Sequence, residues 1–315
     1  MQAVVYSAPM TLENMDVVEP QPQPGDVIVE VRAVGICGSE LEGFASGSPF
    51  RVPPLIMGHE IAGVRADTGA HVAVNPMVAC MACDLCGRGL PNVCRNRQIL
   101  GIQRAGGYTE RVAVPEVNCH VADSSIPFTT LALAEPLANA VHALRLVEQH
   151  DPWPQRAGII GAGAIGLCQA LVARARGIPH VELCDLSPDR LETARRAGIT
   201  ARQGELDGEF DVIFDTVGLA VTRGASLRLV RPGGTAMWVG LHGAAAELDG
   251  RAMIRNEIRV LTTFGYSRHD FQVAVDFTGG LEPDWIQTYP VGRGAEAFLG
   301  LLSGPAAATK IMLVN

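Results

Sequence analysis

The most informative stretch of this 315-residue sequence reads Gly158-Ile159-Ile160-Gly161-Ala162-Gly163-Ala164-Ile165-Gly166. A short apolar run leads directly into the spacing G-x-G-x-x-G, and a helical pattern follows as far as Arg176. Glycines at this spacing permit a tight turn and let the backbone approach a pyrophosphate, whose charge the helix N-terminus favours. The alternative is a plain glycine turn before a helix. The stretch predicts a dinucleotide site formed by Gly161, Gly163, Ala164, Ile165 and Gly166.

The residues that follow alternate between short apolar strands and helical stretches, which predicts a parallel sheet with crossover helices. Asp185 lies at the end of the next expected strand. Its carboxylate suits the two hydroxyls of an adenine ribose and would repel a 2′-phosphate, so NAD is preferred over NADP. Arg190 either covers the adenosine or is an ordinary exposed helix residue.

The N-terminal part of the chain has a different pattern, in which short apolar runs are separated by turns rich in Pro and Gly. Residues 27–34, 71–74 and 109–114 are examples, and they predict a barrel-like β fold. The chain is therefore expected to be an α/β protein. The expected domains are residues 1–135 with 275–315 for the β-rich part and residues 136–274 for the dinucleotide-binding part.

Four cysteines, Cys80, Cys83, Cys86 and Cys94, follow the pattern C-x2-C-x2-C-x7-C. Four thiolates this close in sequence can hold one tetrahedral Zn²⁺ at about 2.3 Å each, and a site with four protein ligands leaves no open position. The pattern predicts a structural zinc in a lobe of about residues 78–97. A small redox centre is the main rival for these ligands, and four free thiols are the simplest alternative.

Composition and charge limit the possible classes of function. Hydrophobic residues make up 48% of the sequence and charged residues 18%, as in a folded globular protein. The formal net charge of −8 provides no general basic field for nucleic acid or anionic lipid. There is neither a secretory signal nor an apolar run of about 18 residues. We therefore expect a cytoplasmic protein whose eight cysteines are metal ligands or buried thiols.

Several short motifs occur together and in order along the chain. They are Gly35-Ile36-Cys37-Gly38-Ser39, Gly58-His59-Glu60, the four-cysteine lobe, Glu135-Pro136-Leu137-Ala138-Asn139, the glycine motif at Gly161 and Lys310-Ile311-Met312-Leu313. With these motifs, nearly the whole chain resembles the zinc-containing medium-chain dehydrogenase/reductase family. The Glu135-Pro136 pair makes it more similar to the sorbitol and threonine dehydrogenase branch. The resemblance implies a GroES-like β-barrel catalytic domain, a Rossmann domain, and assembly as a homodimer or homotetramer.

The resemblance also implies a catalytic zinc, whose ligands would be Cys37, His59, Glu135 and, in some states, Glu60. Ser39 matches the hydroxyl that passes the proton of the alcohol outward. Glu40 stands where the family usually has Asp, which orients the zinc-bound histidine. Glu42 stands where the family often has a histidine that continues the proton relay, so either Glu42 itself, another group or solvent relays the proton.

The implied reaction is the oxidation of a secondary alcohol, polyol or amino alcohol with hydride transfer to NAD, using two zinc ions per chain. Backbone groups of Val217 and Leu241 would contact the nicotinamide, unless these residues only pack at strand ends. A small alcohol is then the expected partner, and neither nucleic acid nor a membrane is. Two alternatives stay open: a zinc-free enone or quinone reductase that uses NADPH, and a non-catalytic protein that binds zinc and a nucleotide.

Overall fold

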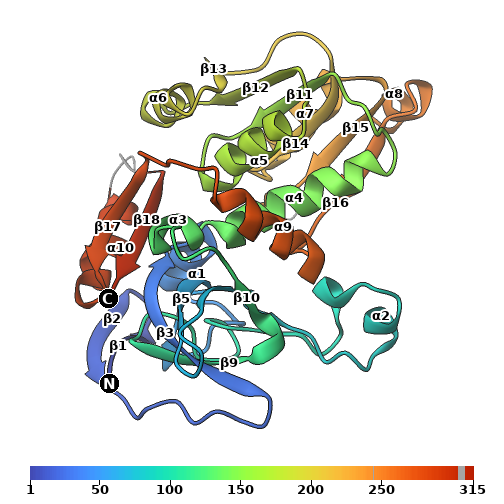
Figure 1. Cartoon of the computed structure of the whole chain (residues 1–315). Coiled ribbons are helices and arrows are strands. Elements are labelled where there is room, and N and C mark those ends of the chain that lie inside the picture. The colour runs from blue at the N-terminus through green and yellow to red at the C-terminus, as the bar shows by residue number, and fades with distance from the viewer. Residues whose placement is uncertain (244, 304–308) are drawn as a thin grey trace. The chain divides into compact units, whose positions relative to one another are not determined.

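The computed structural model describes residues 1–243, 245–303 and 309–315 (Figure 1). These residues form two compact units. Unit 1 consists of Met1–Ala138 and Ser267–Asn315, and unit 2 of Asn139–Tyr266. Among the helices of the described residues, none has both the length and the apolar character that a membrane span requires.

Unit 1 is built on a largely antiparallel sheet with the strand order β10-β6-β5-β3-β18-β17, in which β9 also pairs with β3. The C-terminal strand β18 pairs with β3 and β17, so segments far apart in the sequence contribute to one sheet. A second sheet has the order β2-β1-β4. The bounds are β1 Gln2–Ala8, β2 Thr11–Asp16, β3 Asp26–Gly35, β4 Leu55–Ile56, β5 Glu60–Arg65, β6 His71–Val74, β9 Arg111–Pro115, β10 Cys119–Val121, β17 Ile286–Pro290 and β18 Lys310–Val314.

Strand β3 shows why this part of the sequence folds as a sheet. Val29, Val31 and Ala33 are fully buried while Arg32 is exposed, which is the alternation of a strand with one face on a core. The core of unit 1 also contains aromatic rings in edge-to-face contact, with Phe298 packed against Phe44 at 5.3 Å between centroids. The helical elements of unit 1 are α1 Gly38–Ser46, α2 Asp84–Gly87, η1 Pro91–Val93, η2 Glu116–Asn118, α3 Phe128–Leu131, the start of α4 Ala134–Glu148, α9 Arg268–Thr278, η3 Val291–Arg293 and α10 Gly294–Ser303.

The cysteine-rich lobe projects from unit 1 and has little regular structure. Its two ends are tied by β7 (Met77–Val78) and β8 (Gln98–Ile99), which form a two-stranded antiparallel sheet. Between them lie only α2 and η1. Elements this short bury little apolar surface, so the lobe needs another source of stability.

Unit 2 contains a six-stranded sheet in which every neighbouring pair is parallel, with the order β13-β12-β11-β14-β15-β16. This is the doubly wound order 3-2-1-4-5-6, and the order reverses between β11 and β14. Helix α5 packs against β11 and β12, α6 against β12 and β13, and α7 against β14 and β15 (Figure 1). The bounds are β11 Arg156–Ile160, α5 Ala164–Ala175, β12 His180–Asp185, α6 Pro188–Arg196, β13 Thr200–Gln203, β14 Phe210–Asp215, α7 Ala220–Leu229, β15 Val230–Trp238, α8 Gly250–Arg255 and β16 Arg259–Thr262.

Candidate metal centres and dinucleotide site

Two strand ends in unit 1 bring a small group of metal-ligating side chains together. Cys37 follows β3 and is the N-cap of α1, and His59 directly precedes β5. Strands β3 and β5 pair so that Gly35 lies opposite Glu60. The ligand atoms of Cys37, His59 and Glu60 consequently lie within 4.8 Å of one another. Gly35 makes room for this group, because a Cβ there would lie 1.8 Å from Glu60 Oε2.

The buried carboxylate of Glu40 organises this group. Its Oε1 accepts a hydrogen bond from the backbone N–H of Gly58 at 2.9 Å and lies 2.9 Å from His59 Nδ1. Its Oε2 accepts from the backbone N–H of Cys37 at 3.1 Å and from the Tyr108 hydroxyl at 2.5 Å. The Nδ1 of His59 is therefore directed at Glu40, which leaves Nε2 as the nitrogen available to a metal. With this contact Glu40 can orient the imidazole of His59, which is the role that the resemblance implies for it.

The charges of this group shift each other's pKa values. Burial alone would raise the pKa of Glu40, but the charge and hydrogen bond of His59, together with Arg51 and Tyr108, lower it to about 2. Burial would likewise lower the pKa of His59, but the charges of Glu40 and Cys37 raise it well above its usual value. Glu40 is consequently an anion at neutral pH, which is the form that accepts hydrogen bonds from all four of its neighbours.

Glu60 is held by a residue whose role was not foreseen. Lys310, the first residue of β18, is buried and forms an ion pair with the carboxylate of Glu60, and it donates to the backbone carbonyl of Ile36 at 2.9 Å. Burial would lower the pKa of Lys310, but the charges of Glu60, Cys37 and Glu135 raise it. The sequence contains no local signal for this pair, because the two residues are 250 positions apart.

Glu135, the expected third zinc ligand, has a different position from Glu60. It is buried in the first turn of α4, where its charge acts on Lys310. Among the described residues, the group within 4.8 Å contains Glu60 and not Glu135. The structure thus brings together Cys37, His59 and Glu60, the ligand expected in some states, and Glu135 lies outside this group.

Ser39 and Glu42 lie on α1, close to Cys37 in sequence. Ser39 is an exposed residue, and its hydroxyl lies 3.4 Å from Cys37 Sγ. It accepts a hydrogen bond at 3.1 Å from Nη2 of Arg51, a buried arginine that sequence reasoning missed. Glu42 is exposed, one helical turn after Ser39. A lone arginine in a loop carries no periodic pattern, so only the fold reveals that Arg51 points inward.

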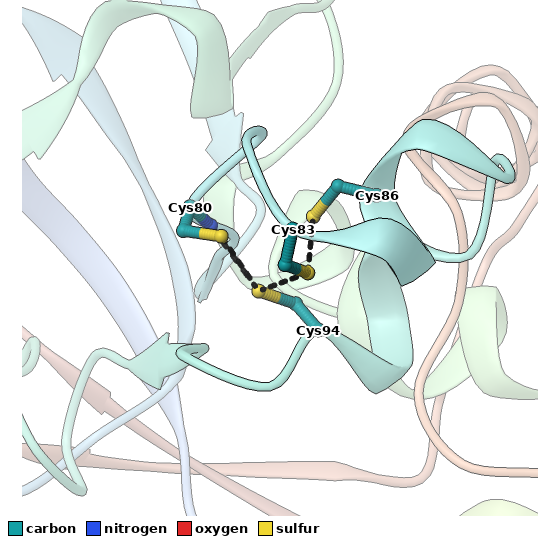
Figure 2. Close-up of side chains that lie close together, drawn as sticks. All are labelled: Cys80, Cys83, Cys86 and Cys94. Atoms are coloured by element: carbon teal, nitrogen blue, oxygen red, sulfur yellow. Dashed lines mark hydrogen bonds between the residues drawn. The ribbon is translucent and has the colours of Figure 1, made fainter.

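The four cysteines of the lobe converge in the way their spacing predicts. Figure 2 shows the sulfur atoms of Cys80, Cys83, Cys86 and Cys94 directed toward one another, with Cys86 on α2 and Cys94 directly after η1. The Sγ–Sγ distances are 3.4 Å for Cys94–Cys80, 3.6 Å for Cys83–Cys86 and 3.8 Å for Cys83–Cys94. A tetrahedral zinc with bonds of about 2.3 Å places its sulfur ligands ~3.8 Å apart, so the residues fit this ion.

The surroundings of Cys83 favour its thiolate, whereas burial raises the pKa of the Cys86 thiol to about 12. Backbone N–H groups of Cys86 and Arg95 donate to Cys83, and these hydrogen bonds lower the pKa of the Cys83 thiol to about 6. The guanidinium of Arg95 forms two hydrogen bonds with the carboxylate of Asp84, at 2.8 and 3.0 Å, which join the start of α2 to the segment after η1. Thiolates are the form in which cysteine binds metal, so the backbone donors at Cys83 favour metal binding by that residue.

The glycine motif of unit 2 has the geometry of a dinucleotide-binding turn. Gly161 follows β11 with φ of 102°, and a Cβ there would lie 2.7 Å from Val217 Cγ2. A Cβ on Gly166 would lie 1.8 Å from the carbonyl oxygen of Gly161, so helix α5 approaches the turn closely only with glycine. Gly163 is the N-cap of α5, and a Cβ at this position would meet no atom within 4 Å. This open space leaves the helix N-terminus accessible to a ligand. Ala164 and Ile165 form the first turn of α5.

Asp185 is fixed beside this turn. Its Oδ2 accepts from the backbone N–H of Ala162 at 2.7 Å, and its Oδ1 accepts from that of Ser187 at 2.8 Å. Ser187 is the N-cap of α6, and its side chain accepts from the backbone N–H of Arg190. The guanidinium of Arg190 lies 3.8 Å from the carboxylate of Asp185, so Arg190 is an ion-pair partner of the residue expected to bind ribose.

Val217 and Leu241 follow neighbouring strands, β14 and β15. The carboxylate of buried Asp215 accepts from the backbone N–H groups of Val217 and Gly218, at 3.0 and 2.9 Å. The carbonyl of Val217 accepts from Nδ1 of His242 at 2.9 Å, a contact that the sequence did not suggest. Leu241 is exposed. Both residues therefore lie at the carboxyl ends of parallel strands, the edge at which doubly wound folds bind ligands.

Comparison with known proteins finds family matches in both units. Residues 23–124 match the model of the alcohol dehydrogenase GroES-like domain, and residues 164–279 match that of the zinc-binding dehydrogenases. The chain is 34% identical to the D-altritol 5-dehydrogenase of Agrobacterium fabrum over 72% of both proteins. It is 31% identical to the L-threonine 3-dehydrogenase of Saccharopolyspora erythraea over 95% of both.

A solved structure agrees with these matches. A zinc-binding dehydrogenase from Sinorhizobium meliloti, bound to NADP, has a TM-score of 0.90 and 27% identity, with 100% of this chain and 99% of that one covered. The expected combination of a GroES-like domain with a Rossmann domain is thereby confirmed. The chain belongs to the zinc-containing medium-chain dehydrogenase/reductase family, in its sorbitol and threonine dehydrogenase-like branch.

Proposed function

We propose that this chain is a zinc-dependent, NAD-linked dehydrogenase that interconverts a secondary alcohol, polyol or amino alcohol and the corresponding ketone. The observation that carries the proposal is the pair of Cys37 and His59, whose ligand atoms lie together while Glu40 holds the far nitrogen of the imidazole. The names of its relatives, which are dehydrogenases of altritol and of threonine, support the same class of reaction.

When bound, zinc supplies a Lewis acid that lowers the pKa of the alcohol, and NAD supplies the acceptor for the hydride of that alcohol. The residues of the chain hold these groups and order them. Cys37 and His59 offer a sulfur and an imidazole nitrogen, which is a donor set that zinc prefers. Glu40 keeps the imidazole in one orientation through the 2.9 Å contact at Nδ1.

Glu135 is proposed as the third ligand of the loaded enzyme, with Glu60 as an alternative. The ion pair with Lys310 occupies Glu60, whereas Glu135 is buried at the start of α4 and acts on the same lysine. If this assignment is right, Glu135→Gln lowers the zinc content of the protein more than Glu60→Gln does. The reverse order would make Glu60 the ligand.

Ser39 is proposed to carry the proton of the alcohol toward solvent. Its hydroxyl lies 3.4 Å from Cys37 Sγ and the residue is exposed, so it connects the metal-ligating group with the surface. Glu42 is exposed one turn further along α1 and can accept the proton from there.

The cysteines of the lobe are proposed to hold a second, structural zinc, since their sulfur atoms have tetrahedral spacing.

NAD is proposed as the preferred cofactor because Asp185 places a carboxylate beside the glycine turn.

We also propose that the protein is a homodimer or homotetramer. The strand β16 lies at the end of the parallel sheet and can pair with another copy, as the resemblance implies. A cytoplasmic location is proposed as well, since thiolates that bind metal require reducing surroundings. Sedimentation and cell fractionation test these two points.

The test of the proposed function combines metal analysis with kinetics on the wild-type protein and Cys37→Ala. We expect two zinc ions per chain in the wild type and one in the variant, with NAD-linked oxidation of secondary alcohols and polyols lost. Cys119→Ala is the matched control, because Cys119 lies in β10, outside both clusters. It should keep both zinc ions and the activity.

Other outcomes separate the alternatives. One zinc ion in the wild type and in Cys37→Ala would leave only the four-cysteine site and end the proposed mechanism. Activity with NADPH on an enone, without zinc, would make the protein a zinc-free reductase. Tight binding of NADH without turnover of any alcohol would favour a non-catalytic role.

A further inference from the structure

Arg51 is a buried cation with few partners. Arg51 is only 6% exposed, yet none of the described carboxylates comes within ion-pair distance of its guanidinium. Nη2 donates one hydrogen bond, to the hydroxyl of Ser39, and Nε is buried without any partner. Burying a charged group in this way is unfavourable unless something else compensates it.

Glu40, a carboxylate on which the charge of Arg51 acts, cannot provide this compensation. The charge of Arg51 acts on Glu40, but only from a distance. The two oxygens of Glu40 are taken by His59, Tyr108 and the backbone N–H groups of Gly58 and Cys37. Most of the five N–H donors of Arg51 therefore remain available to another acceptor.

The position of Arg51 shows where such an acceptor would lie. The arginine crosses the face of α1 at Gly43, where a Cβ would lie 3.2 Å from Arg51 Cδ, and its guanidinium reaches Ser39. Ser39 and Gly43 are four residues apart and share one face of α1. Through the Ser39 hydroxyl, two successive hydrogen bonds connect the guanidinium with Cys37 Sγ. The flanking side chains of Phe50 and Val52 are exposed, so Arg51 turns inward while its two neighbours in the loop face solvent.

We propose that Arg51 binds an oxyanion group of the substrate, so that the preferred substrate is a polyol that carries a carboxylate or a phosphate. This inference rests on the proposed function, because it places the anionic group beside the alcohol that Cys37 and His59 serve. A guanidinium offers paired, planar donors that match the oxygens of either group. The fixed hydrogen bond to Ser39 orients the guanidinium before the substrate arrives, which reduces the entropy lost on binding.

The test uses three six-carbon probes that differ only at carbon 1: D-glucitol, D-gluconate and D-glucitol 1-phosphate. The zinc-loaded wild-type enzyme is compared with Arg51→Gln and Arg51→Lys. We expect kcat/KM to be higher for at least one anionic probe than for D-glucitol. Arg51→Gln should lower kcat/KM for that anionic probe about 10- to 100-fold more than for D-glucitol, in line with hydrogen bonds to charged groups. Arg51→Lys should retain part of this preference, since it keeps the charge.

A binding measurement gives a readout independent of turnover. Titration calorimetry of D-gluconate and of inorganic phosphate into the zinc-loaded enzyme should show binding that Arg51→Gln weakens about 10- to 100-fold. The probe that loses more identifies the source of the oxyanion as a carboxylate or a phosphate. Arg32→Gln is the matched control, because Arg32 is exposed on β3 and pairs with Glu30. It should bind both probes as the wild type does.

The outcomes distinguish this inference from the proposed function. Equal losses of kcat/KM on all three probes in Arg51→Gln, with no change in binding of either anion, would overturn the inference and make Arg51 a support for the loop alone. Oxidation of D-glucitol or a simple secondary alcohol in that experiment would leave the proposed function intact. Failure to oxidise any alcohol, neutral or anionic, would instead overturn the proposed function.

Discussion

Glu40 accepts hydrogen bonds from four groups that come from three separate segments of unit 1. All four neighbours direct N–H or O–H groups at it, so an acceptor is required at both of its oxygens. In Glu40→Gln, the amide NH₂ would face donors at one of these positions. We expect zinc affinity at the Cys37–His59 group to fall about 10- to 100-fold, as for other residues that orient a metal-bound histidine.

Competition with a fluorescent chelator measures this change in zinc affinity. Glu13→Gln is a suitable control, because Glu13 lies on the exposed face of β2. Zinc affinity that is unchanged in Glu40→Gln would show that the imidazole of His59 keeps its orientation without a carboxylate at Nδ1.

Asp185 decides the choice between the two nicotinamide dinucleotides if the proposed function is right. Its carboxylate is fixed by two backbone N–H groups, and Arg190 lies 3.8 Å away. We expect Asp185→Ser to reduce the ratio of kcat/KM for NAD to that for NADP by at least about tenfold, since removal of the carboxylate ends the repulsion of a 2′-phosphate and frees Arg190 to bind it. Steady-state kinetics with both cofactors measures the ratio. Asp189→Ser, in the first turn of α6, is the control, and an unchanged ratio in Asp185→Ser would mean that another residue selects the cofactor.

The candidate site residues divide into those that sequence could identify and those that it could not. Cys37, His59 and Glu40 belong to short local motifs, and the contact between Glu40 and His59 could be expected from them. Lys310 and Arg51 could not be assigned in this way, because their partners, Glu60 and Ser39, are brought near only by the pairing of β18 with β3 and by the loop after α1. An isolated basic residue in a sequence is normally exposed, so nothing marked these two as buried.

At the scale of elements, Asp211 at the start of β14 joins three strands of the parallel sheet. Its carboxylate accepts from the backbone N–H groups of Gln155 and Arg156, both at 2.7 Å, and pairs with Arg231 of β15. Burial would raise the pKa of Asp211, but these hydrogen bonds and the charge of Arg231 lower it. We expect Asp211→Ala to reduce the free energy of unfolding by about 1.5–3 kcal/mol, the usual contribution of hydrogen bonds to a charged group.

The same carboxylate gives unfolding a defined pH dependence. Because the pKa of Asp211 is lower in the folded than in the unfolded chain, its stabilisation is complete above the unfolded value of 3.8 and is lost as pH falls through the folded value. The stability difference between the wild type and Asp211→Asn should therefore shrink below about pH 4. Urea unfolding at several pH values measures it, with Asp207→Asn, an exposed position, as the control. A difference that stays constant down to pH 2.5 would contradict the role given to the charge.

Over the whole molecule, sequence patterns specified unit 2 more completely than unit 1. In unit 2 the apolar runs and the helices between them determine a parallel sheet, and right-handed crossovers leave few possible strand orders. The sheet of unit 1 depends on pairs such as β18 with β3 and β9 with β3, which join distant segments. Short antiparallel strands give no indication of their partners, because any of them can pair with any other of similar length. The resemblance supplied what local patterns in that part lacked.

The two units should respond separately to their two kinds of ligand. Zinc is proposed to bind only residues of unit 1, and the dinucleotide turn with Asp185 lies entirely in unit 2. Hydrogen exchange followed by mass spectrometry can locate both responses. Removal of zinc by a chelator should speed exchange at residues 37–41, 58–60 and 80–94, since the cysteine lobe has little core of its own. Addition of NADH at about 100 times its Kd should stabilise the protein by ~2.7 kcal/mol and slow exchange first at residues 161–167 and 185–190.

The variant Cys94→Ser separates the two proposed zinc sites within unit 1. It should speed exchange at residues 80–94 while residues 37–41 and 58–60 exchange as in the wild type, because the two groups of ligands share no residue. Exchange that rises at all three segments in this variant would mean that the lobe stabilises the Cys37–His59 group, and that the four-cysteine zinc is more than a local support. Exchange that is unchanged even at residues 80–94 would mean that the lobe keeps its structure without four thiolates, and the structural zinc would have to be abandoned.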